Sequence, residues 1–456
     1  MLTTQPIAAL PPSQHTPMRL RDRLARVVDL AAARAALWPF LATRLAFIVI
    51  GLAAPLLYAD HPTRTPPAPD GTGWAIWDAR WFTGIALHGY AYKEVASQHY
   101  YPAAAFFPLY PLAIRLLTIT GLNADAAATL IANAAFLAAL YYLYRLIALD
   151  FPHAVAVRAL WLLALFPTAL AFFVPYTESP YLLFAVLTFW NLRQRRWLAA
   201  GLFGALGALT RQTGLVLLLA YLVESRKSEV GSDRLVGSRK SEVGSDRLVG
   251  SRKSGVGNGL PIHGTTPTRA NRRTRWSHFR LPTFDFRLIV GAVLMPAAVA
   301  AHLVYLWRVT GNPLMFVRAQ GTWHRRPALP WAGIVATVQR WSWRATTDLQ
   351  RAHMALELGA VVLFLALLAI GARRLRLSYT VYAGAVWLAA LVSPAVGDAS
   401  KLPLMSSSRF ALSVFPSFII LALLLRRPGT YQAWLTASAM LVGFLAAFFV
   451  LGGWVA

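Results

Sequence analysis

Length, composition and charge already exclude most soluble proteins. The chain has 456 residues, of which 57% are hydrophobic and 14% charged, against about 25% charged in a soluble domain. The net charge of +26 would suit a nucleic-acid-binding protein, but an excess of Lys and Arg in cytoplasmic loops explains it, so we expect no nucleic-acid partner. The absence of cysteine excludes cysteine-ligated metal sites.

Repeated apolar runs predict an all-α polytopic membrane protein with about 11 membrane helices, some of them short. Because an arginine at the centre of one span costs about 2.5–3.5 kcal/mol, we expect two short helices that meet at Arg211. The predicted spans are 36–58, 124–147, 158–175, 179–192, the two short helices of 197–223, and then 287–308, 353–371, 379–396, 410–425 and 431–452.

Four segments follow from this pattern. The basic N-terminal segment 1–35 is expected in the cytoplasm, ahead of an N-terminal transmembrane catalytic module at 36–224. In the basic segment 225–283, SRKSEVGSDRLVG is repeated without an apolar face, which predicts a disordered cytoplasmic loop. A C-terminal transmembrane module at 284–456 completes the chain. Extracytoplasmic loops are predicted at 59–123, 309–352 and 397–409.

The first outer loop is exceptional because it mixes aromatic and ionisable side chains. Helical spacing in Trp77–Tyr90 predicts an amphipathic helix at the bilayer surface, with Asp78 at its start. An ordinary loop helix with Asp78 as its N-cap would have the same pattern. The apolar run 103–121 is short and contains Pro108, so we interpret it as juxtamembrane or re-entrant, although a full span stays open.

Several motifs are absent. The chain has no Asp-x-Asp, no P-loop, no His-Glu-x-x-His and no dinucleotide-binding glycine pattern. Soluble nucleotide donors and metal-dependent hydrolysis are therefore disfavoured, and we predict neither a metal site nor a cofactor.

A few ionisable residues on the predicted outer face remain as candidates. Asp78 is a candidate general base. Glu178 ends a span beside two prolines, which suits a functional acid or a carboxylate at a helix N-terminus. Arg211 and Arg409 suit bidentate binding of phosphate, or pairing with those two carboxylates. Besides Glu178, Arg211 and Arg409, the candidate substrate-binding residues are Arg80, His88, Tyr90, Tyr110, Tyr176, Gln212, Trp323 and Arg325.

A carboxylate base, arginines for phosphate and aromatic rings for a sugar face fit one reaction class. A lipid-phosphate sugar carries its own leaving group, and arginines can stabilise the negative charge that develops on the phosphate. The carboxylate can take the proton of the acceptor hydroxyl. The sequence therefore favours a glycosyl transferase that uses a lipid-linked sugar phosphate as donor.

Six motifs in order resemble the phosphatidylinositol-glycan class V mannosyltransferase family, in a form that looks bacterial. They begin with W-D-x-x-W-F-x-x-I-A-x-x-G-Y at Trp77, and departures from the family pattern occur at Thr177 and at Gln212–Thr213. The other motifs are AFFPLYP from Ala105, PYTES from Pro175, LTRQTG from Leu209, FVRAQGTWHR from Phe316 and SRF-x-L-x-x-FP from Ser408.

The resemblance implies a GT-C fold and transfer of mannose from a polyprenyl-phosphate donor with inversion, with Asp78 as the base. The implied acceptor is a glycolipid, a polymer or a protein on the extracytoplasmic face of a bacterial inner membrane, the plasma membrane. A small membrane subunit is a further expected partner. The competing classes are a polytopic lipid or glycan transporter or flippase, which needs ionisable residues near the bilayer midplane, and a scaffold without catalysis.

Overall fold

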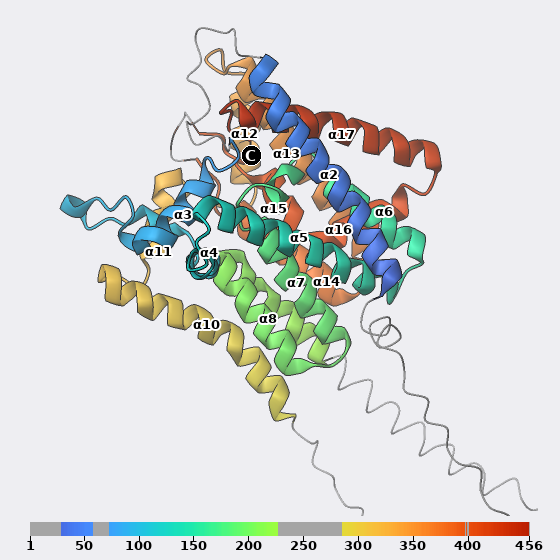
Figure 1. Ribbon diagram of the computed structural model, residues 1–456, viewed down its shortest axis with the longest axis horizontal. Coiled ribbons are helices and arrows are strands. Elements are labelled where there is room, and N and C mark those ends of the chain that lie inside the picture. The colour runs from blue at the N-terminus through green and yellow to red at the C-terminus, as the bar shows by residue number, and fades with distance from the viewer. Residues whose placement is uncertain (1–28, 58–72, 227–284, 397, 399–400, 456) are drawn as a thin grey trace, which may run out of the picture.

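The computed structural model describes residues 29–57, 73–226, 285–396, 398 and 401–455. The N-terminal residues 1–28 and nearly all of the predicted disordered loop 225–283 lie outside these ranges. The described residues form helices and no named strand (Figure 1). The all-α prediction is therefore confirmed for the part of the chain that the structure describes.

Two sets of helices lie before and after the gap at 227–284, and the division into two transmembrane modules stays a prediction. The α-helices of the first set are α2 (Leu30–Leu57), α3 (Asp78–His88), α4 (Leu109–Thr118), α5 (Ala124–Ala148), α6 (His153–Ala164), α7 (Glu178–Arg193) and α8 (Trp197–Thr210). Those of the second set are α10 (Phe286–Thr310), α11 (Met315–Ala319), α12 (Ala332–Trp341), α13 (Asp348–Gly371), α14 (Leu377–Leu391), α15 (Ser407–Ser413), α16 (Phe415–Leu424) and α17 (Pro428–Val450). The short 3-10 helices are η1 (Gly89–Ala91), η2 (Ala96–Gln98), η3 (Pro102–Ala105), η4 (Ala169–Phe172), η5 (Gln212–Val216) and η6 (Gln320–Trp323).

Five of these helices, α2, α5, α10, α13 and α17, are long and apolar enough to cross a membrane. A sixth span results if α15 and α16, which meet at a bend of 85°, are counted as one broken span. The apolar helices α4, α6, α8 and α14 are shorter than the roughly 20 residues that a full span needs. The chain is a polytopic membrane protein by these criteria, and the count of about 11 spans stays a prediction.

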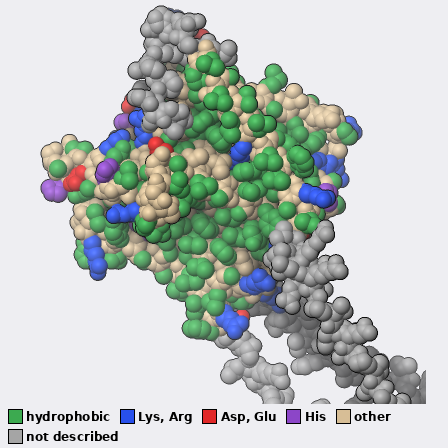
Figure 2. Space-filling model, in the orientation of Figure 1, with side chains coloured by type: hydrophobic (Ala, Val, Ile, Leu, Met, Phe, Trp, Pro, Cys, Tyr) green, Lys and Arg blue, Asp and Glu red, His purple; other side chains and the backbone are tan. Residues whose placement is uncertain are grey.

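The surface agrees with a lipid environment. Leu45 and Leu52 on α2 are 66% and 69% exposed. Exposing a continuous patch of such large apolar side chains to water would be energetically unfavourable. Figure 2 shows hydrophobic side chains over most of the middle of this face, with Lys and Arg side chains mainly toward its margins.

The centre of the molecule is α7, most of whose residues are buried. It packs against α5 and α8, and α8 in turn packs closely against α10. Gly201 and Gly291 make this last approach feasible, because a Cβ built on Gly201 would lie 2.1 Å from the carbonyl oxygen of Gly291. Small residues at this contact thus allow the two helices to pack closely.

Two local features position the polar residues. Arg211 follows the last residue of α8 with extended backbone angles (φ −148°, ψ 147°), and η5 begins at the next residue, so the predicted break at Arg211 is confirmed. The predicted outer loop 397–409 is too long by three residues, because α15 already begins at Ser407. Arg409 therefore lies on a helix, and that helix fixes its direction.

Candidate active site

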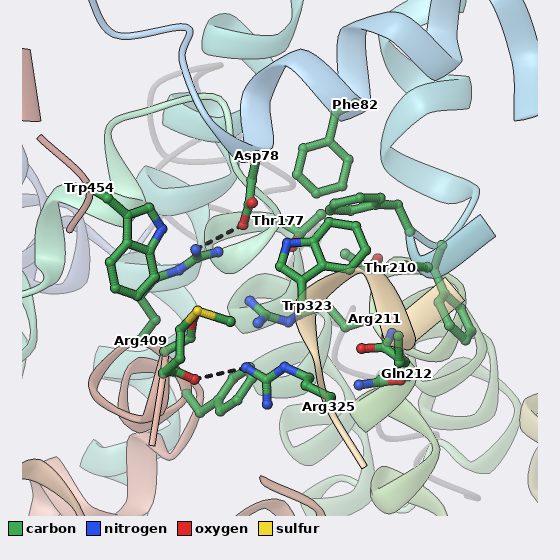
Figure 3. A pocket seen from close by; sticks show the side chains of 17 residues that line it. Asp78, Phe82, Thr177, Thr210, Arg211, Gln212, Trp323, Arg325, Arg409 and Trp454 are labelled. Carbon is green, nitrogen blue, oxygen red and sulfur yellow. Dashed lines mark hydrogen bonds and ion pairs between the residues drawn. The ribbon is translucent and has the colours of Figure 1, made fainter. Parts of the chain in front are cut away.

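A pocket with about 820 Å³ of empty space lies where the start of α3, the end of α8, α15 and the segment after α11 converge (Figure 3). Its polar and charged lining residues are Asp78, Thr177, Thr210, Arg211, Gln212, Gln320, Arg325, Ser406 and Arg409. Its aromatic lining residues are Phe82, Phe106, Phe107, Trp323, Phe410 and Trp454. Residues that are far apart in the sequence thus form one wall.

Asp78 is the one carboxylate among the described residues that line this pocket. It is the first residue of α3, whereas the N-cap position belongs to Trp77, whose side chain makes no capping bond. Trp77 has φ 57°, a left-handed conformation that is strained for a bulky residue. The Asp78 carboxylate accepts a hydrogen bond from Nη1 of Arg409 at 2.8 Å and is 24% exposed. The N-cap interpretation of Asp78 is therefore wrong.

Arg409 bridges two carboxylates. Its Nε and Nη2 donate to Oε1 of Glu178 at 3.0 and 2.8 Å, and its Nη1 donates to Asp78. The guanidinium lies 4.6 Å from the ring centre of Tyr176, which is buried behind it. The alternative that Arg409 pairs with Asp78 and Glu178 is thus correct. Arg409 holds Asp78 in place, and its capacity for a phosphate is correspondingly reduced.

Glu178 lies beneath the pocket and joins the two arginines. It is the first residue of α7, its side chain has no exposed surface, and its Oε1 lies 2.7 Å from Nη1 of Arg211. A buried carboxylate at a helix N-terminus is stabilised by the helix dipole as well as by its cationic partners. Glu178 therefore organises the positive charge of the site instead of lining the cavity.

Arg211 and Arg325 present cationic groups on the other side of the pocket from Trp454 (Figure 3). Nη1 and Nη2 of Arg325 donate to the carbonyl oxygens of Ser393 and Met405 at 2.9 and 2.8 Å. Burial lowers the pKa of Arg325 to about 10, which leaves the guanidinium charged at neutral pH. Among the described residues, Arg325 has no ion pair, so its positive charge is uncompensated by direct contact.

Glu357 is a residue that the sequence reasoning missed. It lies on α13, is 2% exposed, and accepts the backbone N–H groups of Ser406 and Ser408 at 3.2 and 2.6 Å. These amides belong to the start of α15, so Glu357 fixes the helix that carries Arg409. The signal was present, because an ionisable residue inside an apolar span is a functional candidate.

The remaining predicted residues divide into two groups. Gln212 and Trp323 line the pocket, and Arg80 lines a neighbouring one together with Asp78 and Trp323. Tyr90 and Tyr110 are buried outside the pocket, where their hydroxyls donate to the carbonyl oxygens of Phe106 and Ala128 at 2.8 Å. His88 is exposed and stacks on Tyr92 with ring centres 6.0 Å apart. His88, Tyr90 and Tyr110 are therefore not brought to the pocket.

The pocket wall has a positive excess. Three arginines and one carboxylate line it, and the buried Glu178 offsets one further charge. Within the described ranges no group of three or more His, Cys, Asp or Glu residues is placed to hold a metal ion. The arrangement is suited to an anionic ligand that approaches a carboxylate base, with aromatic rings on the other walls.

Comparisons of this chain with family models, with curated proteins and with solved structures found no match. The resemblance to the phosphatidylinositol-glycan class V family therefore depends on the sequence motifs alone.

Proposed function

We propose that this protein is a membrane glycosyltransferase. It transfers a sugar, most simply mannose, from a polyprenyl-phosphate donor to a glycolipid, polymer or protein acceptor on the extracytoplasmic face. The observation that carries the proposal is a pocket in which Asp78 lies opposite the cations Arg211 and Arg325 (Figure 3). A base at one side and positive charge at the other is what a single displacement of a phosphate leaving group requires.

The chemistry balances without a further reactant. The acceptor oxygen attacks the anomeric carbon, the bond from that carbon to the phosphate oxygen breaks, and the configuration inverts. The acceptor proton passes to the carboxylate of Asp78, and the lipid phosphate leaves as an anion toward Arg211 and Arg325. Arg409 orients the carboxylate through its hydrogen bond at 2.8 Å, as a positioning residue.

A separate, mainly apolar pocket supports a lipid-linked donor. It has about 840 Å³ of empty space and is lined by residues such as Ala86, Pro108, Leu112 and Leu209. The two pockets share no lining residue, but residues adjacent in sequence line them, Thr210 in the charged pocket and Leu209 in the apolar one. Burial of an isoprenoid chain there would contribute roughly 25 cal/mol for each Å² of apolar surface removed from water.

The finer expectations belong to the same proposal. We infer a GT-C type architecture in which the shorter helices α6, α7, α8 and α14 and the helical segment 217–226 add to the six candidate spans to give about 11 membrane helices. The predicted location is the plasma membrane, with the pocket on its outer side. No cofactor is part of the proposed reaction, and a small membrane subunit remains a proposed partner.

Transfer by the purified protein tests this function. The full chain in lipid nanodiscs would be given radiolabelled polyprenyl-phosphate mannose and a membrane lipid extract, with and without a chelator. We expect labelled product that is retained after chelation. Asp348→Asn provides a matched control, because this aspartate is 98% exposed and lies outside the pocket.

A transporter gives a different result. In liposomes, a flippase would move the labelled donor across the bilayer without forming product. That outcome, together with no transfer in nanodiscs, would overturn the proposal in favour of transport.

A further inference from the structure

A second cavity adjoins the charged pocket at Asp78. It has about 1590 Å³ of empty space, and four of its lining residues, Asp78, Trp323, Met405 and Trp454, also line the charged pocket. Asp78 therefore stands at the boundary of two cavities. One contains Arg211 and Arg325, and the other lies toward Trp77 and Arg80.

The chemical character of the second cavity is cationic and aromatic. Arg80, Lys93 and Lys401 line it, and Asp78 is its one carboxylate among the described residues. Lys93 is exposed, and its Nζ lies 4.6 Å from the ring centre of Trp81, a cation–π contact at the cavity wall. Its indole rings belong to Trp77, Trp81, Trp323 and Trp454.

Such a wall is suited to a sugar that carries a negative charge. Indole faces pack against the apolar faces of sugar rings, and lysine and arginine bind phosphate or carboxylate groups. A neutral ligand would leave the three positive charges of this cavity without a partner. The single carboxylate of the cavity, Asp78, is already paired with Arg409. The charge pattern thus predicts the class of ligand as well as its place.

We propose that this second cavity is the acceptor site and that the acceptor is an anionic glycan or glycolipid. The inference rests on the proposed function, since it assigns the two cavities to the two substrates of one transfer. The donor phosphate then lies toward Arg211 and Arg325. The acceptor hydroxyl approaches Asp78 from the side of Arg80 and Lys93, so attack and departure take place on opposite sides of the anomeric carbon.

Equilibrium binding tests this assignment without any turnover. The wild-type chain in nanodiscs of zwitterionic lipid would be titrated with three tritiated probes: octyl mannoside 6-phosphate, neutral octyl mannoside and octyl phosphate. We expect the first to bind roughly tenfold more tightly than either of the others. Arg80→Gln/Lys93→Gln should remove most of this advantage, whereas affinity for neutral octyl mannoside should stay within about twofold.

A matched control and a competition experiment define the site. Arg344→Gln changes an exposed arginine of the predicted outer loop 309–352 that lines neither cavity, and it should leave all three affinities unchanged. Polyprenyl phosphate, which occupies the donor pocket in this account, should not displace octyl mannoside 6-phosphate.

Three results would overturn the proposal. Equal binding of octyl phosphate would indicate a lipid phosphate site, equal binding of neutral octyl mannoside would exclude charge recognition, and displacement by polyprenyl phosphate would place the probe in the donor pocket. Failure of the function itself is distinguishable, because it would appear as absence of transfer while selective binding persists.

Discussion

Two ion-pair clusters lie at opposite ends of α7, about 24 Å apart by the rise of a 16-residue helix. The pocket cluster contains Glu178, the first residue of the helix, with Asp78, Arg211 and Arg409. The distal cluster contains Arg193, the last residue of the helix, with Asp150, Glu224 and Arg376.

Both clusters join distant segments through two carboxylates and two arginines, yet their surroundings differ. In the distal cluster Arg376 lies 3.3 Å from Asp150 and 3.5 Å from Glu224, and Ser378 donates to Glu224 at 2.7 Å. None of its members lines the charged pocket, the apolar pocket or the second cavity. The pocket cluster faces a cavity and has Arg325 as an additional cation. The distal cluster is balanced in charge and faces none of these cavities, which indicates a structural role. The pocket cluster has an excess of positive charge at a cavity, which indicates a binding site.

The largest effect on folding is expected from Glu178→Ala. This change leaves Arg211 and Arg409 without their shared buried partner, which typically costs about 3–5 kcal/mol. Asp150→Ala is the matched control at the other end of α7, and because Asp150 is 23% exposed it should cost about 1 kcal/mol. Denaturant unfolding of the purified proteins measures both, and equal losses would remove the distinction between the clusters.

The next effect is kinetic and concerns the donor. Arg211→Lys keeps the charge but loses the planar fork, so KM for the polyprenyl-phosphate sugar should rise roughly tenfold to a hundredfold. Arg193→Lys, the same change in the distal cluster, should leave KM unchanged. If Arg211→Lys has no kinetic effect, Arg325 must hold the phosphate without it.

A smaller effect is expected from Glu357→Gln, which tests whether this carboxylate positions α15. The amide keeps one acceptor oxygen for the N–H groups of Ser406 and Ser408 but loses the second. A shift of Arg409 and Asp78 of less than an ångström should lower kcat by roughly tenfold, with donor KM unchanged. A rise in KM with an unchanged kcat would contradict the positioning role.

The smallest effect is a pH dependence of stability from the distal cluster. Burial opposes ionisation of Asp150, but hydrogen bonds from Arg193 and Arg376 more than offset it and lower the pKa below 3.8. The folded pKa is depressed, so this stabilisation is present above pH 3.8 and is lost as the pH falls through the folded value. From pH 6 to pH 3, the Tm of the wild type should therefore fall more than that of Asp150→Asn. Equal decreases would show that the ion pairs contribute nothing.

Much of the fold could be predicted because the length of an apolar run, and the free energy of placing an arginine within it, depend only on the local sequence. The break at Arg211 was predicted from the unfavourable free energy of placing an arginine at the centre of a span. In the structure, η5 begins at the next residue. The span count differs in this respect, because α8 and α14 coincide with predicted spans but are shorter than the roughly 20 residues that a full span needs.

Sequence reasoning about the site succeeded where topology alone brings residues together. Asp78, Arg211 and Arg409 were expected on one membrane face, and they line one pocket. It could not choose between partners, because Arg409 was expected either to bind phosphate or to pair with a carboxylate, and in the structure it links Asp78 to Glu178. Tyr90 lines the apolar pocket and not the charged one, because an aromatic side chain with a polar tip fits a buried hydrogen bond as well as a sugar.

In the proposed mechanism Asp78 is the base and the distal cluster has no chemical role. Turnover of Asp78→Asn and Asp150→Asn, measured side by side with radiolabelled polyprenyl-phosphate mannose, distinguishes the two clusters. Asp78→Asn should lose roughly 10²- to 10⁴-fold in turnover with its unfolding transition and donor affinity retained, because the amide preserves size but not basicity. Asp150→Asn should turn over like the wild type. Normal turnover of folded Asp78→Asn would contradict the account.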